Sequence, residues 1–206
     1  CNLVMLKRKL YSRLLGWKDT ENKKCLVVKG ARQVGKTFLV RAFGEAEYES
    51  FIEINFLRQP ELKQIFSGNL SGEEIYKRMT ASIPGIKMIP GKTLVFLDEI
   101  QKCAAARTAL KFLAEDGRFD VIASGSLLGL AYGRDDDKEV DRVESVPVGY
   151  EISMMMYSLD FEEFLWANGY SEDAVGYLRG LFEKREAVPD NIHQKYEQLV
   201  REFIVV

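Results

Sequence analysis

The residues with the most specific chemical pattern lie between positions 30 and 38. Gly30-Ala31-Arg32-Gln33-Val34-Gly35-Lys36-Thr37 fits the pattern G-x-x-x-x-G-K-[ST] at every position, and Phe38 follows it. Glycines let such a loop curl, so that successive backbone N–H groups point at phosphate oxygens. In this pattern Lys36 reaches the β- and γ-phosphates and the Thr37 hydroxyl ligates Mg²⁺. The segment is therefore predicted to bind the phosphates of ATP or GTP, a P-loop.

Two acids follow a later apolar run and extend this chemistry. Leu94-Val95-Phe96-Leu97 precedes Asp98 and Glu99. Asp98 would hold the water shell of Mg²⁺, and Glu99 would polarise the attacking water as a general base. An ordinary strand end exposed to solvent has the same sequence, but the position after the P-loop and after an intervening strand favours the catalytic interpretation. The acid pair also favours hydrolysis over transfer to a small acceptor.

A third polar segment, Ser124-Gly125-Ser126, ends another apolar run. Ser124 is predicted to lie between the two acids and the γ-phosphate and to take part in catalysis, although Ser-Gly-Ser is also ordinary turn sequence. An arginine would neutralise charge in the transition state of such a reaction. The sequence does not choose among the candidates for this arginine, and for each of them solvation on the surface is favoured over a catalytic role: Arg107, Arg118, Arg134 and Arg142.

The chain as a whole predicts the sheet that would bring these residues together. Apolar, β-rich runs at 25–29, 51–56, 93–97 and 119–123 alternate with helical patterns at 36–43, 60–67, 72–82 and 104–115. Alternation of this kind predicts an α/β fold of three layers, with a central, mostly parallel sheet between helices. Ligands of such sheets bind at the carboxyl ends of the strands, where all three polar segments fall.

The remaining segments are predicted to be one strand and several helices. Residues 151–157 are expected to form a fifth strand, and the helices are expected at 6–17, 161–168, 172–185 and 192–203. The first of these helices has leucines at helical spacing with basic residues between them. We therefore expect a P-loop domain over residues 1–157 that includes the first helix, followed by a helical segment over residues 158–206.

Composition excludes several classes of protein. The 206 residues are 47% apolar and 29% charged, a globular profile, and the net charge of −2 argues against strong bulk attraction to nucleic acid. Three cysteines far apart and a single histidine do not make a zinc site, and they suggest the reduced thiols of the cytoplasm. No apolar run approaches the ~20 residues of a membrane span. A cytoplasmic location without membrane association is expected.

Motifs along the chain together support a resemblance. Five strings occur in a fixed order: the P-loop string, Leu97-Asp98-Glu99-Ile100-Gln101, Ser124-Gly125-Ser126-Leu127-Leu128-Gly129, Pro147-Val148-Gly149 and Leu159-Asp160-Phe161-Glu162-Glu163-Phe164-Leu165. Over residues 6–206 the chain resembles the prokaryotic AAA-type ATPases whose ATPase domain precedes a C-terminal domain of unknown function. The resemblance implies the additional-strand P-loop fold, ATP with Mg²⁺, and a helical segment that leads toward a further domain. Tyr150 stands where many members have a basic residue, whose role is therefore not carried over.

Four functional hypotheses follow. The leading one is an Mg²⁺-dependent ATPase that couples hydrolysis to conformational change of attached domains or partners. Whether it forms a homo-oligomer, and whether its partner is a protein or DNA, is left open by the sequence. The second is a nucleotide-dependent switch with little turnover. The third is a DNA-associated ATPase, motivated by the resemblance and by Lys7, Arg8, Lys9 and Arg13. A nucleotide kinase ranks last, because residues 129–149 are acidic and poor in the arginines of a kinase lid.

Overall fold

A single sheet organises the fold. The structure, a computed structural model, describes residues 6–126 and 150–205. Over these residues five strands lie side by side in the order β2-β3-β4-β1-β5, and all of the pairings are parallel. The predicted α/β fold with a parallel sheet is confirmed. The strands are β1 (Cys25–Gly30), β2 (Ser50–Asn55), β3 (Thr93–Asp98), β4 (Asp120–Ser126) and β5 (Glu151–Met156).

The place of β4 in the sheet decides which residues can meet. β4 lies between β1, which ends at the P-loop, and β3, which ends at Asp98. It is the additional strand that the sequence resemblance implies. In register, Ser124 on β4 is opposite Val28, and the neighbouring Ala123 is opposite Leu97. The carboxyl ends of the three central strands are therefore at the same level of the sheet.

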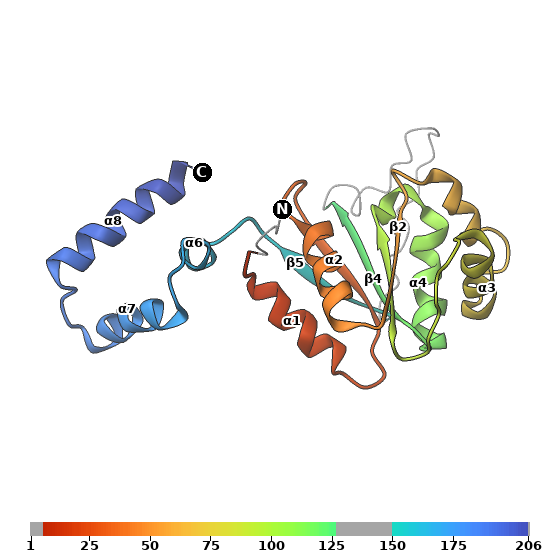
Figure 1. Ribbon diagram of the computed structural model, residues 1–206, viewed down its shortest axis with the longest axis horizontal. Helices are drawn as coiled ribbons and strands as arrows, with labels where there is room; N and C mark the ends of the chain where they lie inside the picture. Colours follow the sequence, from red (N-terminus) through yellow and green to blue (C-terminus); the bar gives the residue numbers. More distant parts are fainter. Residues whose placement is uncertain (1–5, 127–149, 206) are drawn as a thin grey trace. The chain divides into compact units, whose positions relative to one another are not determined.

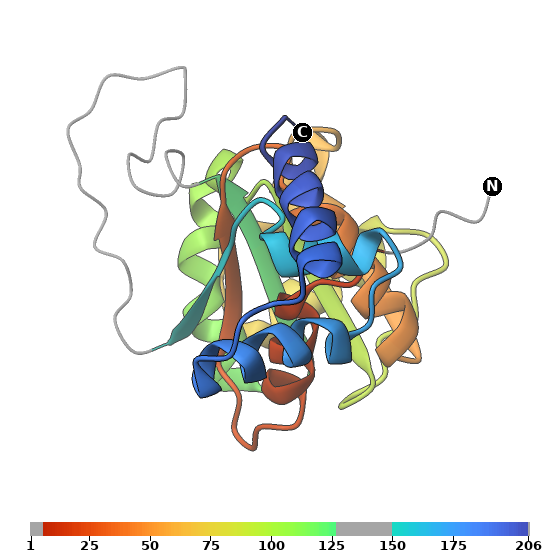
Figure 2. The same ribbon diagram turned by 90° about the vertical axis from the view of Figure 1, so that its left-hand side faces the viewer.

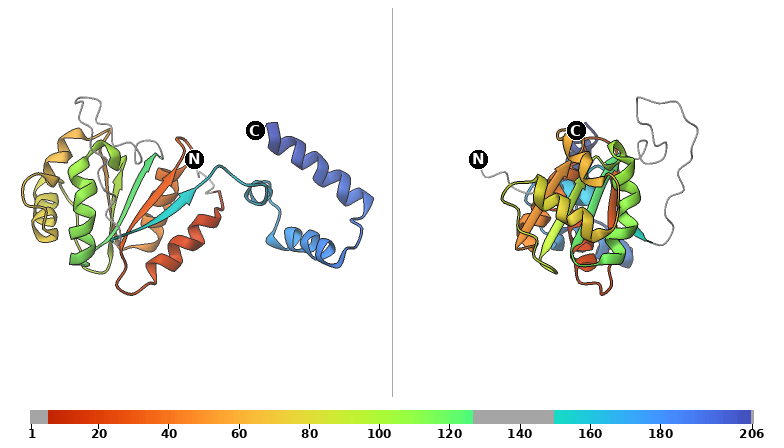
Figure 3. Two further views of the ribbon diagram at one scale, coloured as in Figure 1. Left: turned by 180° about the vertical axis from the view of Figure 1, so that it is seen from behind. Right: turned by 90° about the vertical axis from the view of Figure 1, so that its right-hand side faces the viewer.

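Helices cover both faces of the sheet and complete the three predicted layers. The crossover connections place α2 (Lys36–Glu47) on one face and α3 (Gly72–Ser82) with α4 (Ala104–Asp116) on the other, as Figures 1 and 3 show. Every residue of β3 is buried, as expected for a parallel strand with both faces covered. Side chains on alternate positions, such as Val27 and Val95, pack into the core beneath α3 and α4.

Two local predictions from sequence were wrong. The helix expected to end near Gly44 continues to Glu47. Gly44 is buried inside this helix and does not end it. A Cβ there would lie 2.2 Å from the Phe51 ring, so the glycine lets α2 approach β2. Residues 60–67 form a 3₁₀ helix, η1 (Pro60–Phe66), rather than an α-helix. β4 has Ser124, Gly125 and Ser126 as its last three residues, in agreement with the expectation that this segment ends the strand.

The chain divides into two compact units. One is Arg13–Tyr157, and the other combines Cys1–Ser12 with Ser158–Val206. The sequence-based division assigns residues 1–12 to the P-loop domain instead. The structure groups residues 6–12 with the helices, because the Lys9 backbone N–H donates to Glu163 at 2.8 Å and the Lys9 amine pairs with Asp160 at 2.7 Å.

The second unit is built from helices, drawn in blue in Figure 2. They are α6 (Phe161–Ala167), α7 (Glu172–Lys184) and α8 (Asp190–Val205), and α1 (Lys9–Lys18) begins in this unit. Asp160 and Glu163 form a capping box that starts α6, a device that satisfies the free N–H groups of a helix end. The rings of Phe161, Phe164 and Phe203 meet between α6 and α8, which fixes these two helices against each other.

We predict that the two cysteines in the described part of the chain resist alkylation while the protein is folded. Cys25 and Cys103 are both buried, and burial raises the pKa of the Cys25 thiol to about 12. At pH 8 such a thiol is ionised to about one part in 10⁴, and only the thiolate reacts. Timed iodoacetamide labelling with mass spectrometry checks this, and the same chain in urea is the control. Rapid labelling of Cys25 in the native protein contradicts the burial.

Candidate functional site

The P-loop joins β1 to α2 by a tight curl. Gly30 ends β1 and Lys36 begins α2, and between them Gln33 and Gly35 have positive φ angles of 65° and 94°. Left-handed residues of this kind turn successive backbone N–H groups into one concave surface, which binds anions. The loop opens the first turn of α2, so the positive end of the helix dipole adds to that field.

Gly30 is required because another strand passes directly beside it. A Cβ at this position would lie 2.2 Å from the backbone oxygen of Met156, the last residue of β5. The Met156 side chain also reaches the loop, since its terminal methyl would lie 3.6 Å from a Cβ on Gly35. The end of β5 therefore sets the shape of the phosphate-binding loop.

Lys36 is held by the loop that it follows. Its side chain is buried, and the amine donates to the backbone oxygens of Gly30 at 3.1 Å and Ala31 at 2.6 Å. Burial lowers the pKa of Lys36, and the negative charges of Glu99 and Asp98 partly offset this. A buried ammonium whose present partners are neutral carbonyls would gain from an anionic partner such as phosphate.

Asp98 is the centre of the site. It is 1% exposed, and it accepts hydrogen bonds from Thr37 Oγ1 at 3.0 Å, Asn55 Nδ2 at 2.7 Å, Ser124 Oγ and the Glu99 backbone N–H at 3.1 Å. The carboxylate thus joins the P-loop helix to three strands. The predicted residues Thr37, Asp98 and Ser124 are brought together by direct contacts.

Asn55 is the member of this set that the sequence analysis missed. It ends β2, is 7% exposed, and uses its Oδ1 to accept from the backbone N–H groups of Leu57 at 3.1 Å and Arg58 at 2.9 Å. A signal was present, because Asn55 is a polar residue at the carboxyl end of a predicted strand. Such residues meet at the same edge as the other polar strand ends.

Glu99 lies immediately beside Asp98 in an unusual backbone conformation. Its φ and ψ are 55° and 44°, left-handed values that cost a residue with a side chain about 1 kcal/mol or more. It is half-buried, and Gln101 donates a hydrogen bond to its Oε2. The chain then enters the 3₁₀ turn η2 (Ile100–Lys102), whose Ile100 is fully buried and anchors the turn.

Two of the four arginine candidates are already engaged by acids. Arg107 makes two bonds to Glu151 at the beginning of β5, one of them 2.9 Å long, and Arg118 makes two bonds of 2.8 Å to Asp116. Arg118 also precedes β4, at the amino end of the sheet opposite to the P-loop. Arg134 and Arg142 lie outside the described residues.

The donor atoms at the site suit Mg²⁺. Mg²⁺ binds hard oxygen ligands, usually one or two from protein together with water and substrate phosphates. The Thr37 hydroxyl and the Asp98 carboxylate, 3.0 Å apart, are such oxygens. In the described part of the chain no cluster of three or more His, Cys, Asp or Glu residues offers an all-protein metal site.

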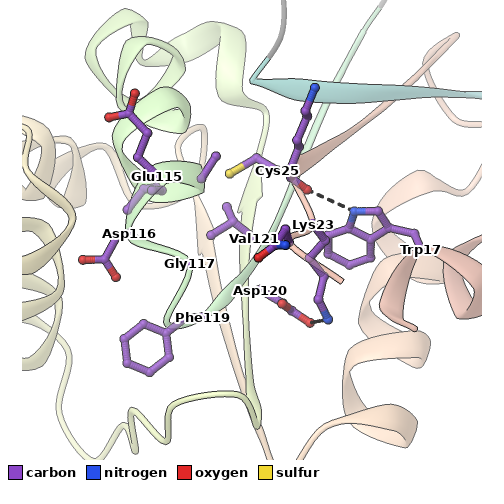
Figure 4. Close-up of a pocket in the computed structure, with 13 residues that line it drawn as sticks. Trp17, Lys23, Cys25, Glu115, Asp116, Gly117, Phe119, Asp120 and Val121 are labelled. Carbon is purple, nitrogen blue, oxygen red and sulfur yellow. Dashed lines mark hydrogen bonds and ion pairs between the residues drawn. The ribbon is translucent and has the colours of Figure 1, made fainter. Parts of the chain in front are cut away.

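A cavity of about 360 Å³ lies elsewhere, at the amino ends of β1 and β4. Figure 4 shows Trp17, Lys23, Cys25, Glu115 and Asp120 around it, with the Lys23 amine 2.7 Å from Asp120 and Trp17 bonded to a backbone oxygen. None of the predicted site residues lines this cavity. Ligands of parallel sheets bind at the opposite edge, so we assign the chemistry to the P-loop edge.

Across the residues that the structure describes, no helix combines the length and apolar character needed to cross a membrane.

Comparison with family models gives a match over most of the chain. A family described as AAA domain matches residues 22–165. No curated protein matches the chain. Among solved structures, the ORC1 protein of Aeropyrum pernix in complex with DNA is similar over 77% of this chain, with 16% identity and a TM-score of 0.44. This chain spans 46% of the length of that protein.

We predict that Gly30→Ala destabilises the protein and distorts the P-loop. The new methyl would overlap the Met156 backbone oxygen, and overpacking of this kind costs about 1–3 kcal/mol. Gly16→Ala is the matched control, since a Cβ there meets nothing within 4 Å, and Ala in a helix is favoured over Gly by about 0.5–1 kcal/mol. Urea denaturation of both variants measures the difference. Equal stability of the two variants would exclude the close approach of β5.

Proposed function

This chain belongs to the AAA domain family of nucleotide-binding P-loop ATPases, and we propose that it hydrolyses ATP with Mg²⁺ at the carboxyl edge of its sheet. The observation that carries the proposal is the set of hydrogen bonds from Thr37, Asn55 and Ser124 to the buried Asp98, next to a buried Lys36. These contacts support the proposal, because they hold side chains that could bind a metal ion and phosphates close to one another.

The first part of the mechanism is binding. The backbone N–H groups between Gly30 and Lys36 hold the phosphates, and the Lys36 amine exchanges its two backbone carbonyls for the β- and γ-phosphates. Thr37 and Asp98, whose side-chain oxygens are in contact, would hold the metal ion. When bound, Mg²⁺ would supply positive charge that stabilises the charge developing on the phosphate oxygens.

The second part is attack by water. Glu99 accepts a proton from a water molecule whose oxygen attacks the γ-phosphorus, and the bond from that phosphorus to the bridging oxygen of ADP breaks. The products are ADP and phosphate. The protein forms no covalent bond to the transferred group in this reaction. Most of the rate enhancement therefore comes from positioning of the reactants and from stabilisation of charge in the transition state.

Ser124 is proposed to support the attack by water through its contact with Asp98. Its hydroxyl donates to Oδ1 of Asp98, and the side chain is 1% exposed. Ser124 therefore orients the metal-binding carboxylate from the additional strand β4. A γ-phosphate close to this carboxylate would be sensed through the same hydrogen bond.

Coupling to movement is proposed to run through β5. The end of β5 touches the P-loop at Gly30 and near Gly35, and the chain continues from Met156 into the helical unit of residues 158–206. A loop that tightens around phosphates would push on the end of this strand. The work of hydrolysis would pass along the chain to the helices, to a second copy or to a protein partner.

The structure weakens one of the two reasons for the DNA-associated alternative, which was the group of basic residues near the start of the chain. Lys7, Arg8 and Lys9 are paired with acids of their own unit: Glu172, Glu163, Asp160 and Glu162. Their positive charge is thus largely offset, whereas affinity for a nucleic acid backbone depends on lysines and arginines that neutralise phosphates.

We predict that Lys36→Ala weakens ATP binding. A hydrogen bond to a charged group contributes about 1.5–3 kcal/mol, equivalent to about 10- to 150-fold in affinity. Calorimetric titration with Mg²⁺ and a non-hydrolysable ATP analogue measures the change. Lys77→Ala is the control, because Lys77 lies exposed on α3 and pairs with Glu73 and Glu74. Unchanged affinity in the Lys36 variant would show that the P-loop is not the phosphate site.

We predict that Glu99→Gln keeps ATP binding and loses turnover. Removal of a general base lowers the rate by about 10²–10⁴-fold, whereas Glu99 makes no predicted contact with the bound phosphates. Phosphate release and analogue affinity are measured on the same preparation, with the exposed Glu115→Gln as control. A nucleotide-dependent switch with little turnover would instead show a low rate in the parent chain and almost no change in the variant.

A further inference from the structure

A partly buried amide lies beside the proposed general base. Gln101 is two residues beyond Glu99, and its Nε2 donates to Glu99 Oε2. The other end of the same amide, Oε1, is buried and has no hydrogen-bond partner among the residues that the structure describes. An unpaired buried acceptor loses the hydrogen bonds that it would make with water, so its presence here needs an explanation.

The backbone holds this amide in a fixed relation to Glu99. The left-handed Glu99 starts η2, and the turn is closed by hydrogen bonds from Lys102 N–H to Glu99 O and from Cys103 N–H to Ile100 O, each 2.9 Å. Ile100, between the two polar residues, is fully buried in the core beneath α4. The turn therefore presents Glu99 and Gln101 as one rigid pair.

An apolar residue would fill the same volume at Gln101 without an unpaired acceptor. The amide is therefore explained only by what its two ends can do. The Nε2 end fixes the direction of a carboxylate, and the Oε1 end can accept from one more donor. A water molecule that attacks phosphorus has two hydrogens, and Glu99 can take only one of them.

We propose that Gln101 is the positioning residue for Glu99: its Nε2 holds the carboxylate, and its Oε1 accepts the second hydrogen of the water that Glu99 activates. This inference rests on the proposed ATPase function. It explains both the contact with Glu99 and the unpaired Oε1 by one role. The pair would orient the oxygen lone pair of the water toward the γ-phosphorus.

Kinetics test the role through two substitutions. Gln101→Met has similar length and removes both hydrogen-bonding ends, and Gln101→Glu keeps an acceptor but loses the donor to Glu99. Each is expected to lower kcat by about 10- to 100-fold, the size of a positioning error of about 1 Å. Affinity for Mg²⁺ and the ATP analogue should not change. A loss of affinity that parallels the loss of kcat would mean a structural role and would overturn the inference.

A double-mutant cycle shows whether Gln101 acts through Glu99. In the Glu99→Gln background, Gln101→Met should have no further effect on the residual rate, because a positioning residue has nothing left to position. If the loss of rate in the double variant equals the product of the losses in the two single variants, the inference is overturned. Gln198→Met is the matched control, since Gln198 on α8 donates to Glu202 at 2.9 Å on an exposed surface. It should leave kcat unchanged.

Nuclear magnetic resonance gives a readout that does not depend on turnover. The side-chain amide signal of Gln101, identified by its loss in Gln101→Met, should shift in Glu99→Gln and shift again when Mg²⁺ and the ATP analogue bind. A signal that is insensitive to both changes would overturn the inference. If instead Lys36→Ala leaves analogue affinity unchanged, the proposed function fails, whereas normal binding with an unaffected Gln101→Met kcat rejects the Gln101 role alone.

Discussion

A carboxylate taken out of water has to be surrounded by donors, and the candidate site is arranged around this requirement. Asp98 is almost fully buried and accepts four hydrogen bonds from neutral groups. Its negative charge also raises the pKa of the buried Lys36 and partly offsets the effect of burial. Isolated buried charge is costly, so each donor must be supplied by a well-placed element. β2, β4 and α2 each supply one of them.

The same requirement explains why Ser124, Asn55 and Thr37 come from separated parts of the chain. The parallel sheet delivers the ends of its strands to one edge, and the additional strand β4 inserts a hydroxyl between the P-loop strand and the acid. α2 adds the Thr37 hydroxyl from above the same edge. The fold therefore surrounds the buried Asp98 carboxylate with hydrogen-bond donors, and the same groups are suited to bind a metal ion and phosphates.

Most of the sheet and the central residues followed from sequence, because their patterns are local. An apolar run ending in polar residues marks a buried strand and its carboxyl end, and the G-x-x-x-x-G-K-T string fixes a loop geometry by itself. The misses were tertiary. Gly44 resembled a helix end, but the Phe51 ring determines its role, and Asn55 had no motif to mark it. The unpaired end of Gln101 is equally invisible in sequence, since it depends on what surrounds a single oxygen.

The strand that carries the P-loop has no partner near it in sequence. β1 pairs with β4, about a hundred residues later, and with β5, which ends at Met156. During synthesis both edges of this apolar strand stay open until the ribosome has released residues 120–156, and pairing over such separations is slow. The P-loop strand can therefore reach its paired state only after the emerging chain has grown through residue 156, well after the P-loop itself has been made.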